Sequence, residues 1–373
     1  MPPILQSVVV GAGQAGLSAA YHLLRLGLRA WEDVVVLDAN PAPGGAWQHR
    51  WDTLTMADVH GVAALPDDAA APTSGERANV VVPAVFADYE RRARLPVLRP
   101  VRVERVDGDG DGDGDGDGDG GVLRVTGAGR TWSTRTLVNA TGTWGRPFIP
   151  HYPGAETFTG RQLHTQGYRG PDELAGQHVV VVGGGLSAVQ ILAEISEVAT
   201  TTWVTRREPV WRTTPFTPAE GRAAVALVED RVRQGLPPQS VVSVTGLMLR
   251  DQERPAAERG VYRRLPMFEH LEPDGVVWAD GARQRADVIL WATGFRPDVA
   301  HLAPLRLRSE HGGIQLDGTT AVRDPRVQLV GYGPSASTIG ANRAGRVAAR
   351  GVMRWLERSA GTTRAAAGEP WRD

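Results

Sequence analysis

The 373-residue sequence contains no cysteine and no lysine. Without cysteine, the chain cannot form disulfides, thiolate nucleophiles, zinc–thiolate sites or cysteine-ligated iron–sulfur clusters. Without lysine, all 41 basic residues are arginine, and a Schiff-base mechanism is excluded. The nine histidines form neither a His-x-His nor a His-Glu-x-x-His spacing. We therefore predict that the protein binds no metal.

The charge pattern gives no sign of a nucleic-acid partner. The formal net charge is -1, and no basic tract with interleaved aromatic residues is present. The N-terminal residues have no basic segment followed by an apolar run, so we expect no signal peptide. No apolar stretch approaches the length of a membrane span. These features predict a cytoplasmic protein without a membrane partner, and its length corresponds to about two domains.

Two stretches of the sequence show the same order of elements: strand, glycine turn, helix. In the first, Ser7–Val10 is apolar, and apolar residues then recur at helical spacing until Gly27. In the second, His178–Val182 reads as a strand and Leu186–Ile195 as a helix. Each stretch predicts the start of a Rossmann-like unit, so the expected fold class is α/β with two dinucleotide-binding domains.

The C-terminal part of the sequence predicts how these domains connect. Val327–Val330 reads as a strand that leads into a long helix ending near Leu356. The simplest assembly inserts the second domain into the first, and the chain then returns to the first domain. We predict that the first domain comprises residues 1–150 and 290–373, and that the inserted domain comprises residues 151–289.

Between the two Rossmann-like units, residues 101–140 read as short strands and turns, which predicts a small β-meander. This region contains an unbroken Asp-Gly alternation from Asp107 to Gly120. Calcium-binding repeats also contain Gly and Asp, but they need apolar residues for their core, and this run has none. We interpret it as a lengthened hairpin loop, which a fold tolerates because the entropy of loop closure grows slowly with length.

The first glycine turn has the spacing Gly11-x-Gly13-x-x-Gly16. In this motif the first glycine allows a tight turn, the second lets the backbone approach a pyrophosphate, and the third lets helix and strand pack closely. The helix N-terminus then presents free N–H groups to the phosphates. Asp38 ends the next strand, where its carboxylate can accept hydrogen bonds from ribose hydroxyls. The predicted dinucleotide-binding residues are Gly11, Gly13, Gln14, Ala15, Gly16 and Asp38.

The second glycine turn repeats this arrangement with alanine at the third position. Its following strand ends in Arg206 and Arg207, where the first unit has an aspartate. A guanidinium at this point suits a 2′-phosphate, so the pattern favours NADPH over NADH, although a solvated surface pair is the alternative. The predicted residues of this site are Gly183, Gly185, Leu186, Ser187, Ala188, Arg206 and Arg207.

Two dinucleotide sites in one chain suggest that a hydride passes from nicotinamide to a second redox cofactor. Disulfide reductases pass electrons onward through a cysteine pair, which this sequence lacks. The final acceptor must then be diffusible, such as dioxygen, a quinone or another small molecule.

Further motifs resemble the flavin-containing (class B) flavoprotein monooxygenases, in particular their short bacterial members. Gly44-Gly45-Ala46-Trp47 is similar to the family's Gly-Gly-x-Trp, which lies near the flavin. The family also has two Ala-Thr-Gly crossings between domains and a Phe-x-Gly-x-x-x-His-x-x-x-Tyr fingerprint just before its second nucleotide fold. The matching residues here are Ala140, Thr141, Gly142, Ala292, Thr293 and Gly294 for the crossings, and Phe158, Gly160, His164 and Tyr168 for the fingerprint.

The resemblance implies that NADPH reduces FAD, that dioxygen forms a flavin C4a-hydroperoxide, and that a small substrate is oxygenated. The fingerprint continues as Tyr168-Arg169-Gly170, which favours N- or S-oxygenation over Baeyer–Villiger chemistry. The resemblance to the family also implies flavin contacts for Gly45 and Trp47, and it is compatible with a homodimer. We expect the fingerprint to be structural, and the backbone of Thr141 and Thr293 to matter more than their hydroxyls.

A helix N-terminus around Ser335 is expected to face the flavin pyrimidine. Two alternatives stay open: an NADPH-dependent reductase that passes electrons to a quinone or oxygen, and a flavin-binding protein without turnover.

Overall fold

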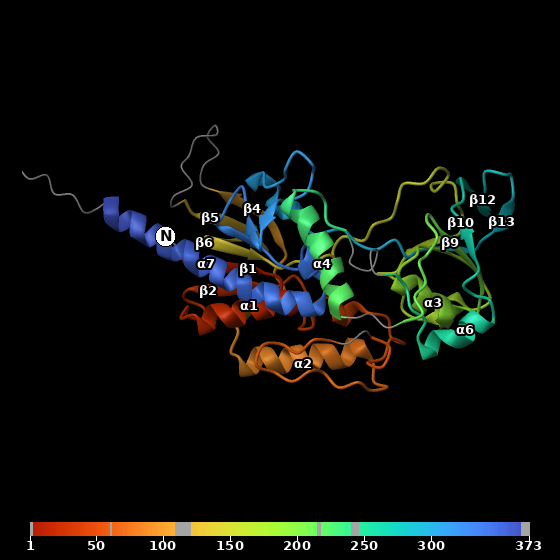
Figure 1. Cartoon of the computed structure of the whole chain (residues 1–373), viewed down its shortest axis with the longest axis horizontal. Coiled ribbons are helices and arrows are strands. Elements are labelled where there is room, and N and C mark those ends of the chain that lie inside the picture. The colour runs from red at the N-terminus through yellow and green to blue at the C-terminus, as the bar shows by residue number, and fades with distance from the viewer. Residues whose placement is uncertain (1–2, 60–61, 109–120, 215–217, 240–245, 367–373) are drawn as a thin grey trace, which may run out of the picture.

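The computed structural model describes residues 3–59, 62–108, 121–214, 218–239 and 246–366. Two sheets with parallel strands form the centres of two units that lie side by side along the long axis of the molecule (Figure 1). This arrangement confirms the α/β class with two Rossmann-like units. Among the described helices, none combines the length and the apolar character needed to cross a membrane.

The first sheet has nine strands and a parallel centre. Seven strands follow the order β15-β16-β17-β6-β1-β2-β3, and β4 and β5 lie off this path, with β5 paired to β6. Each residue of β2 is buried, as expected for a parallel strand covered on both faces. The strands of this sheet are β1 (Leu5–Val10), β2 (Val34–Leu37), β3 (Val97–Leu98), β4 (Val103–Gly108), β5 (Leu123–Gly127), β6 (Arg130–Asn139), β15 (Leu316–Asp317), β16 (Thr320–Ala321) and β17 (Val327–Leu329).

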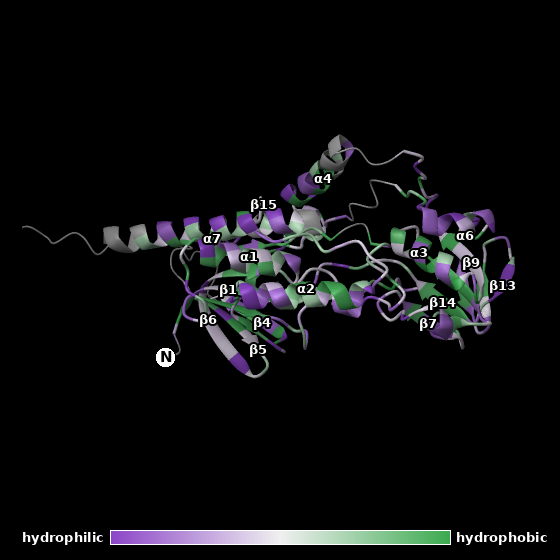
Figure 2. Ribbon diagram, turned by 90° about the horizontal axis from the view of Figure 1, so that it is seen from below, coloured by the Kyte–Doolittle hydropathy of each residue, from purple (hydrophilic) through white to green (hydrophobic). Residues whose placement is uncertain are grey.

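Helices cover one face of the first sheet and the β-meander covers the other. The helical face carries α1 (Gln14–Arg25), α2 (Ala78–Arg92) and α7 (Thr338–Ala366). Figure 2 shows hydrophobic and hydrophilic residues alternating along α2 and α7, as expected for helices with one buried side. On the opposite face, β4 and β5 pack on the central strands. They form the predicted antiparallel meander with the first half of β6, whose second half pairs parallel with β1 inside the sheet.

The Asp-Gly alternation lies between two strands of this meander. β4 and β5 pair antiparallel on either side of it, from Val103 opposite Gly127 to Gly108 opposite Leu123. Most of the alternation, residues 109–120, lies outside the described residues.

The second sheet has five parallel strands in the order β10-β9-β8-β14-β7. Helix α3 (Leu186–Ile195) packs on one face, and a three-stranded antiparallel sheet packs on the other. The strands of the parallel sheet are β7 (Arg161–His164), β8 (His178–Val182), β9 (Thr200–Thr205), β10 (Arg264–Pro266) and β14 (Val288–Trp291), and those of the small sheet are β11 (His270–Glu272), β12 (Gly275–Val277) and β13 (Arg283–Arg285).

The chain enters the second unit after β6 and returns to the first sheet with β15, β16 and β17, and β17 pairs parallel with β6. The second unit is therefore inserted into the first. The other described helical elements are helix α4 (Pro218–Arg233) and the short segments η1 (Gly45–His49), η2 (Pro171–Leu174), η3 (Asp251–Glu253), α6 (Arg254–Glu258), η4 (Ala300–Leu305) and η5 (Gly333–Ala336).

The structure differs from the expected domain limits in two places. The boundary at residue 290 falls inside β14, which pairs with β8 from Val288 to Trp291, so the chain leaves the second sheet only after Trp291. Helix α4 lies within residues 151–289 but contacts η5 and β15 of the first unit. Its Val232 is buried in the core of the first unit, and this apolar contact explains where the helix docks.

Candidate functional site

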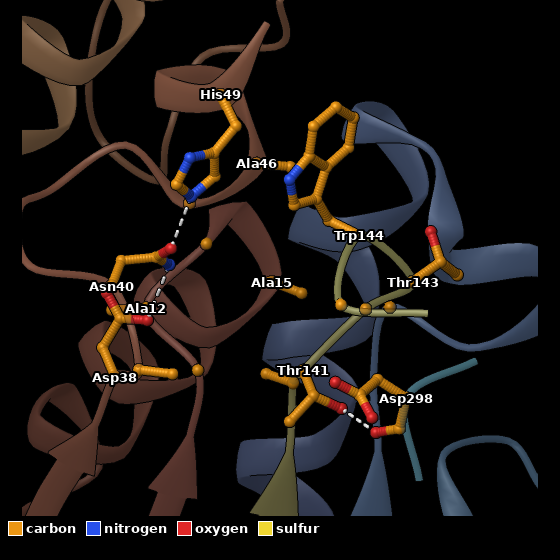
Figure 3. A pocket seen from close by; sticks show the side chains of 18 of the residues that line it. Ala12, Ala15, Asp38, Asn40, Ala46, His49, Thr141, Thr143, Trp144 and Asp298 are labelled. Atoms are coloured by element: carbon orange, nitrogen blue, oxygen red, sulfur yellow. Dashed lines mark hydrogen bonds between the residues drawn. The ribbon is translucent and has the colours of Figure 1, made fainter. Parts of the chain in front are cut away.

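A cavity of about 1030 Å³ lies at the C-terminal edge of the first sheet. The first glycine turn, η1, the first domain crossing, the segment that follows the second crossing from Phe295 on, and the start of α7 contribute to its wall. Figure 3 shows His49 and Trp144 at one side of this cavity and Asp38, Thr141 and Asp298 at the other. The carboxyl ends of parallel strands are where open α/β sheets bind ligands.

The first glycine turn has the geometry that its spacing predicts. Gly11 has φ +98°, and a Cβ on it would lie 2.6 Å from the Ala140 carbonyl oxygen. A Cβ on Gly16 would lie 1.9 Å from the Gly11 oxygen, so helix and turn require glycine there. A Cβ on Gly13 would meet no described atom within 4 Å. The backbone at Gly13 thus faces open space, as a turn that accepts a pyrophosphate requires.

Helix α1 begins next to this open backbone. No side chain caps its N-terminus, and its first turn contains no acidic residue. Gln14 and Ala15 line the cavity in that first turn. The free N–H groups and the positive end of the helix dipole therefore fit a phosphate ligand.

Asp38 is buried at the end of β2 and lines the cavity. Its Oδ1 accepts a hydrogen bond from Asn40 Nδ2 at 3.1 Å, and its Oδ2 accepts one from Arg99 Nε at 2.8 Å. Arg99 also binds Glu90 through both of its terminal nitrogens, at 2.7 and 2.6 Å. These contacts fix the carboxylate in one orientation, with lone pairs left for ribose hydroxyls.

Aromatic side chains border the cavity opposite Asp38. The Trp144 ring stacks on His49 at 6.1 Å and on Phe295 at 4.9 Å between centroids. Gly45 and Trp47 also line the cavity, and a Cβ on Gly45 would lie 2.9 Å from Gly13 Cα. The Gly-Gly-x-Trp segment therefore lies directly against the first glycine turn.

Two residues of this site carry no signal in the sequence. His301 and Asp298 line the cavity from the segment that follows β14. His301 Nε2 lies 2.7 Å from Asn139 Oδ1, and burial lowers the pKa of His301 below its usual value. The neutral ring therefore donates to the Asn139 amide oxygen. Their position depends on the chain returning from the second unit, which no local pattern reveals.

The second glycine turn repeats the geometry of the first. Gly183 has φ +137°, and a Cβ on it would lie 2.2 Å from the Ala292 oxygen. A Cβ on Gly185 would meet no described atom within 4 Å. Helix α3 then begins without a side-chain cap or an acidic first turn, with Leu186, Ser187 and Ala188 at its start. In both units the first glycine therefore lies against the alanine carbonyl of an Ala-Thr-Gly crossing.

Arg206 and Arg207 directly follow β9, and both are exposed. They lie at the carboxyl end of the strand next to β8, on the same edge of the sheet as the second glycine turn. The cavity of the first unit does not reach them or the second turn.

The sequence predicts that the backbone of the crossing threonines matters more than their hydroxyls, and in the structure both hydroxyls form hydrogen bonds. Thr141 Oγ1 donates to the Asp298 carbonyl oxygen at 2.6 Å, and Thr293 Oγ1 donates to the Phe148 carbonyl oxygen. Each hydroxyl thus binds the backbone of the opposite crossing. The segments that follow the two crossings also run antiparallel to each other, and the Phe148 backbone N–H donates a hydrogen bond to the Gly294 oxygen at 3.0 Å. The hydroxyls therefore help to hold the two crossings together.

The fingerprint residues are structural in the described chain, and none of them lines the cavity. Phe158 belongs to the core of the second unit, and a Cβ on Gly160 would lie 2.5 Å from the Asp287 oxygen. His164 Nδ1 accepts from Gln166 N at 3.1 Å, so its Nε2 donates to the Gly294 oxygen at 2.9 Å. His164 therefore ties β7 to the second crossing.

Glu194 of α3 joins the second unit to the first, and Tyr168 of the fingerprint contributes to this contact. The Glu194 carboxylate accepts hydrogen bonds from Tyr168 Oη at 2.9 Å, Trp51 Nε1 at 2.9 Å and Thr53 Oγ1 at 2.7 Å. Trp51 and Thr53 follow η1 of the first unit. Burial raises the pKa of Glu194, while these donors oppose that rise. We call this group of four residues the Glu194 clasp.

Ser335 lies in η5, and its Oγ bonds only to the Tyr332 backbone among the described residues. It lines the cavity together with Ser337 and Ala341, which flank the beginning of α7 at Thr338. A long helix therefore begins at the cavity, a few residues later than the sequence suggests.

Comparisons with known proteins agree with this geometry. The model of the pyridine nucleotide-disulphide oxidoreductase family matches residues 5–332. A flavin-containing monooxygenase from Stenotrophomonas maltophilia is 37% identical and superposes with a TM-score of 0.79, over 95% of this chain and 99% of that chain. An uncharacterized oxidoreductase, CzcO-like, from Geobacillus kaustophilus is 25% identical over 345 residues, which cover 87% of this chain and 90% of that protein.

A Baeyer-Villiger monooxygenase from Streptomyces coelicolor is 30% identical over 210 residues, which cover 54% of this chain and 38% of that protein. The chain belongs to the pyridine nucleotide-disulphide oxidoreductase family, and within it to the flavin-containing monooxygenases. It is a flavin-dependent oxidoreductase, as its sequence motifs predict.

Proposed function

We propose that the protein is a monooxygenase that binds FAD on its first glycine turn and NADPH on its second. One observation supports this most directly. Both turns combine a glycine that lies against a crossing carbonyl, a second glycine that faces open space, and an uncapped helix without acid in its first turn. A hydride transfer between two bound dinucleotides requires two phosphate-binding turns, and both turns have these three features.

For FAD, we assign the pyrophosphate to the turn that contains Gly11, Gly13 and Gly16, together with Gln14 and Ala15 of α1. The ribose hydroxyls would bind Asp38, which Asn40 and Arg99 orient. The isoalloxazine would lie between Gly45 and Trp47 on one side and the α7 start near Ser335 on the other. Ala140, Thr141 and Gly142 would form the floor beneath it.

For NADPH, we assign the pyrophosphate to the turn at Gly183 and Gly185 and to the first turn of α3. Arg206 would bind the 2′-phosphate, with Arg207 beside it, because both guanidiniums are exposed at the end of β9. Ala292, Thr293 and Gly294 would border the nicotinamide end. We thus assign FAD to the outer domain and NADPH to the inserted one, and α4 belongs with the former by its contacts.

When bound, FAD would supply the redox chemistry: with two electrons from NADPH, one atom of dioxygen would be inserted into a small N- or S-nucleophile and the other would leave as water. The chain's own residues have other tasks. Trp47, Trp144 and Phe295 shield the cavity from water, and a dry cavity protects reactive species from side reactions. The Glu194 clasp and the paired crossings hold the second turn in place relative to the first.

A product assay under labelled dioxygen tests this proposal. The FAD-loaded protein is supplied with NADPH, ¹⁸O₂ and one amine, one sulfide or one ketone, and product masses are measured. We expect one labelled oxygen atom in an amine or sulfide product. Labelled ketone-derived ester would instead indicate Baeyer–Villiger chemistry. NADPH consumption that yields only hydrogen peroxide would indicate a reductase, and no NADPH consumption would indicate a flavin-binding protein without turnover.

A further inference from the structure

Arg50 is a partly buried guanidinium that has no acidic partner among the described residues. Its Nε is shielded from solvent and donates no hydrogen bond within the described chain. Three other guanidiniums with low exposure are all paired: Arg99 with Asp38 at 2.8 Å, Arg250 with Glu253 at 2.7 Å, and Arg326 with Asp324 at 2.8 Å. Arg50 therefore differs from these three guanidiniums.

Two indole rings hold the Arg50 guanidinium at the cavity wall. Its Cζ lies 4.8 Å from the Trp144 ring centroid and 5.6 Å from that of Trp47. Such contacts are favourable for a cation, but they provide no counter-charge. Burial lowers the pKa of Arg50 to about 10, so the side chain stays protonated at neutral pH. A protonated, partly desolvated cation without a counter-ion is unfavourable unless a ligand supplies the negative charge.

The surroundings of Arg50 make this part of the cavity positive. Arg146 and Arg169 line the same cavity, and both are exposed. Arg169 donates to the His49 carbonyl oxygen at 3.2 Å, which keeps it beside η1. The acidic residues that line the cavity are Asp38, Glu104 and Asp298, and none of them forms an ion pair with these three guanidiniums.

Arg50 also lies close to a phosphate-binding element. It directly follows η1, and η1 begins at Gly45 against the Gly13 backbone. The five residues of η1 span roughly 10 Å at the rise of a 3₁₀-helix. An arginine side chain at the end of this segment can reach a dinucleotide that starts at the first glycine turn.

We propose that Arg50 binds a phosphate oxygen of a dinucleotide that lies in this cavity. The planar guanidinium fork matches two phosphate oxygens, and the neighbouring Arg146 and Arg169 suit the double charge of a pyrophosphate better than the single charge of a carboxylate. The proposal rests on the proposed function, because it presumes that FAD and NADP⁺ are the ligands. Either dinucleotide can bring this phosphate, and the experiment below separates them.

The test measures dissociation constants of FAD for the apoprotein and of NADP⁺ for the FAD-loaded protein. Arg50→Met should raise one of the two constants by about 10- to 100-fold, the range expected for losing hydrogen bonds to a charged group. Arg50→Lys, which keeps the charge and loses the fork, should raise the same constant less. The control is Arg135→Met on the exposed side of β6, which should leave both constants unchanged.

A rise in the FAD constant alone assigns the phosphate to FAD, and a rise in the NADP⁺ constant alone assigns it to NADP⁺. If both dissociation constants of Arg50→Met stay within about twofold of the wild type, the proposal is wrong. If, in addition, the KM for an acidic substrate is raised, Arg50 would be assigned to a substrate carboxylate. Failure of the wild type to bind FAD would instead overturn the proposed function.

If Arg50→Met does not fold, chemical modification of arginine in the wild-type protein tests whether Arg50 contacts a dinucleotide. Phenylglyoxal labelling is followed by peptide mass spectrometry with and without saturating FAD or NADP⁺. We expect one dinucleotide to protect Arg50 and neither to protect Arg135. Equal labelling of Arg50 under all conditions would overturn the proposal.

Discussion

The Glu194 clasp gives the sharpest prediction about how the two units are held together. In the wild type, the carboxylate accepts hydrogen bonds from Trp51, Thr53 and Tyr168. In Glu194→Gln only one of the two terminal atoms of the side chain is still an oxygen that accepts hydrogen bonds. The other becomes an amide nitrogen, which would face the N–H or O–H donor that bonds to the carboxylate in the wild type. If the oxygen stays near Thr53 and Tyr168, the Trp51 indole N–H loses its partner. A buried unpaired donor costs about 1–3 kcal/mol.

Two assays measure this cost and its consequence. Thermal unfolding should show a Tm that falls by about 2–4 °C for each kcal/mol lost. Anaerobic mixing of the FAD-loaded variant with NADPH should show slower flavin reduction, because α3 starts at the second glycine turn and a shift of about 1 Å can cost on the order of 100-fold in rate. FAD affinity should stay unchanged, since Glu194 does not line the cavity.

The matched control is Glu197→Gln, which removes a largely exposed carboxylate near the end of the same helix. It should leave Tm and the reduction rate as in the wild type. The reasoning fails if Glu194→Gln behaves like this control in both assays, because the three hydrogen bonds would then contribute nothing to the contact between the units.

Three further predictions follow from the site. Gly11→Ala should destabilise the apoprotein by about 1–3 kcal/mol in urea unfolding, because Gly11 has φ +98° and a Cβ on it would lie 2.6 Å from a carbonyl oxygen. Gly13→Ala should leave the stability of the apoprotein unchanged and still weaken FAD binding. Equal behaviour of the two variants would contradict the assigned turn. Arg206→Ala should raise KM for NADPH at least about 10-fold and that for NADH much less, and equal changes would contradict a 2′-phosphate contact. Burial lowers the pKa of His164 and His301 below 6.5, so the unfolded chain takes up protons on these residues at a higher pH than the folded chain does. The free energy of unfolding contributed by these residues should therefore be full above pH 6.5 and fall as the pH drops below it. His301→Gln should lessen this fall when urea unfolding is measured at a series of pH values, and an unchanged dependence on pH would refute the contribution of His301.

Much of the fold follows from local patterns in the sequence. The first glycine turn is readable from the sequence because its strand, glycines and helix are consecutive and one constraint is local: a Cβ on Gly16 would lie 1.9 Å from the Gly11 oxygen. The strands around both glycine turns read clearly because parallel strands buried on both faces need unbroken apolar runs. The sequence predicts a structural fingerprint, and in the structure His164 and Tyr168 bind between segments rather than face the cavity.

Other features depend on contacts between distant residues, which a single sequence does not show. Arg99 orients Asp38 from 61 positions away, and Glu194 meets Trp51 across 143 positions. The docking of α4 on the first unit depends on the apolar surface it finds there, not on its own pattern. The crossing threonines illustrate the same point, because each hydroxyl acts on a segment more than 140 positions away.

The central claim is that electrons pass from NADPH on the inserted unit to FAD on the outer one, and anaerobic reduction tests it most directly. Protein reconstituted with FAD is mixed with NADPH without oxygen, and the flavin absorbance is followed. The account predicts complete bleaching with NADPH, at a rate that Arg206→Ala slows at subsaturating NADPH. A protein that takes up no FAD, or whose bound flavin stays oxidised with saturating NADPH, would contradict it.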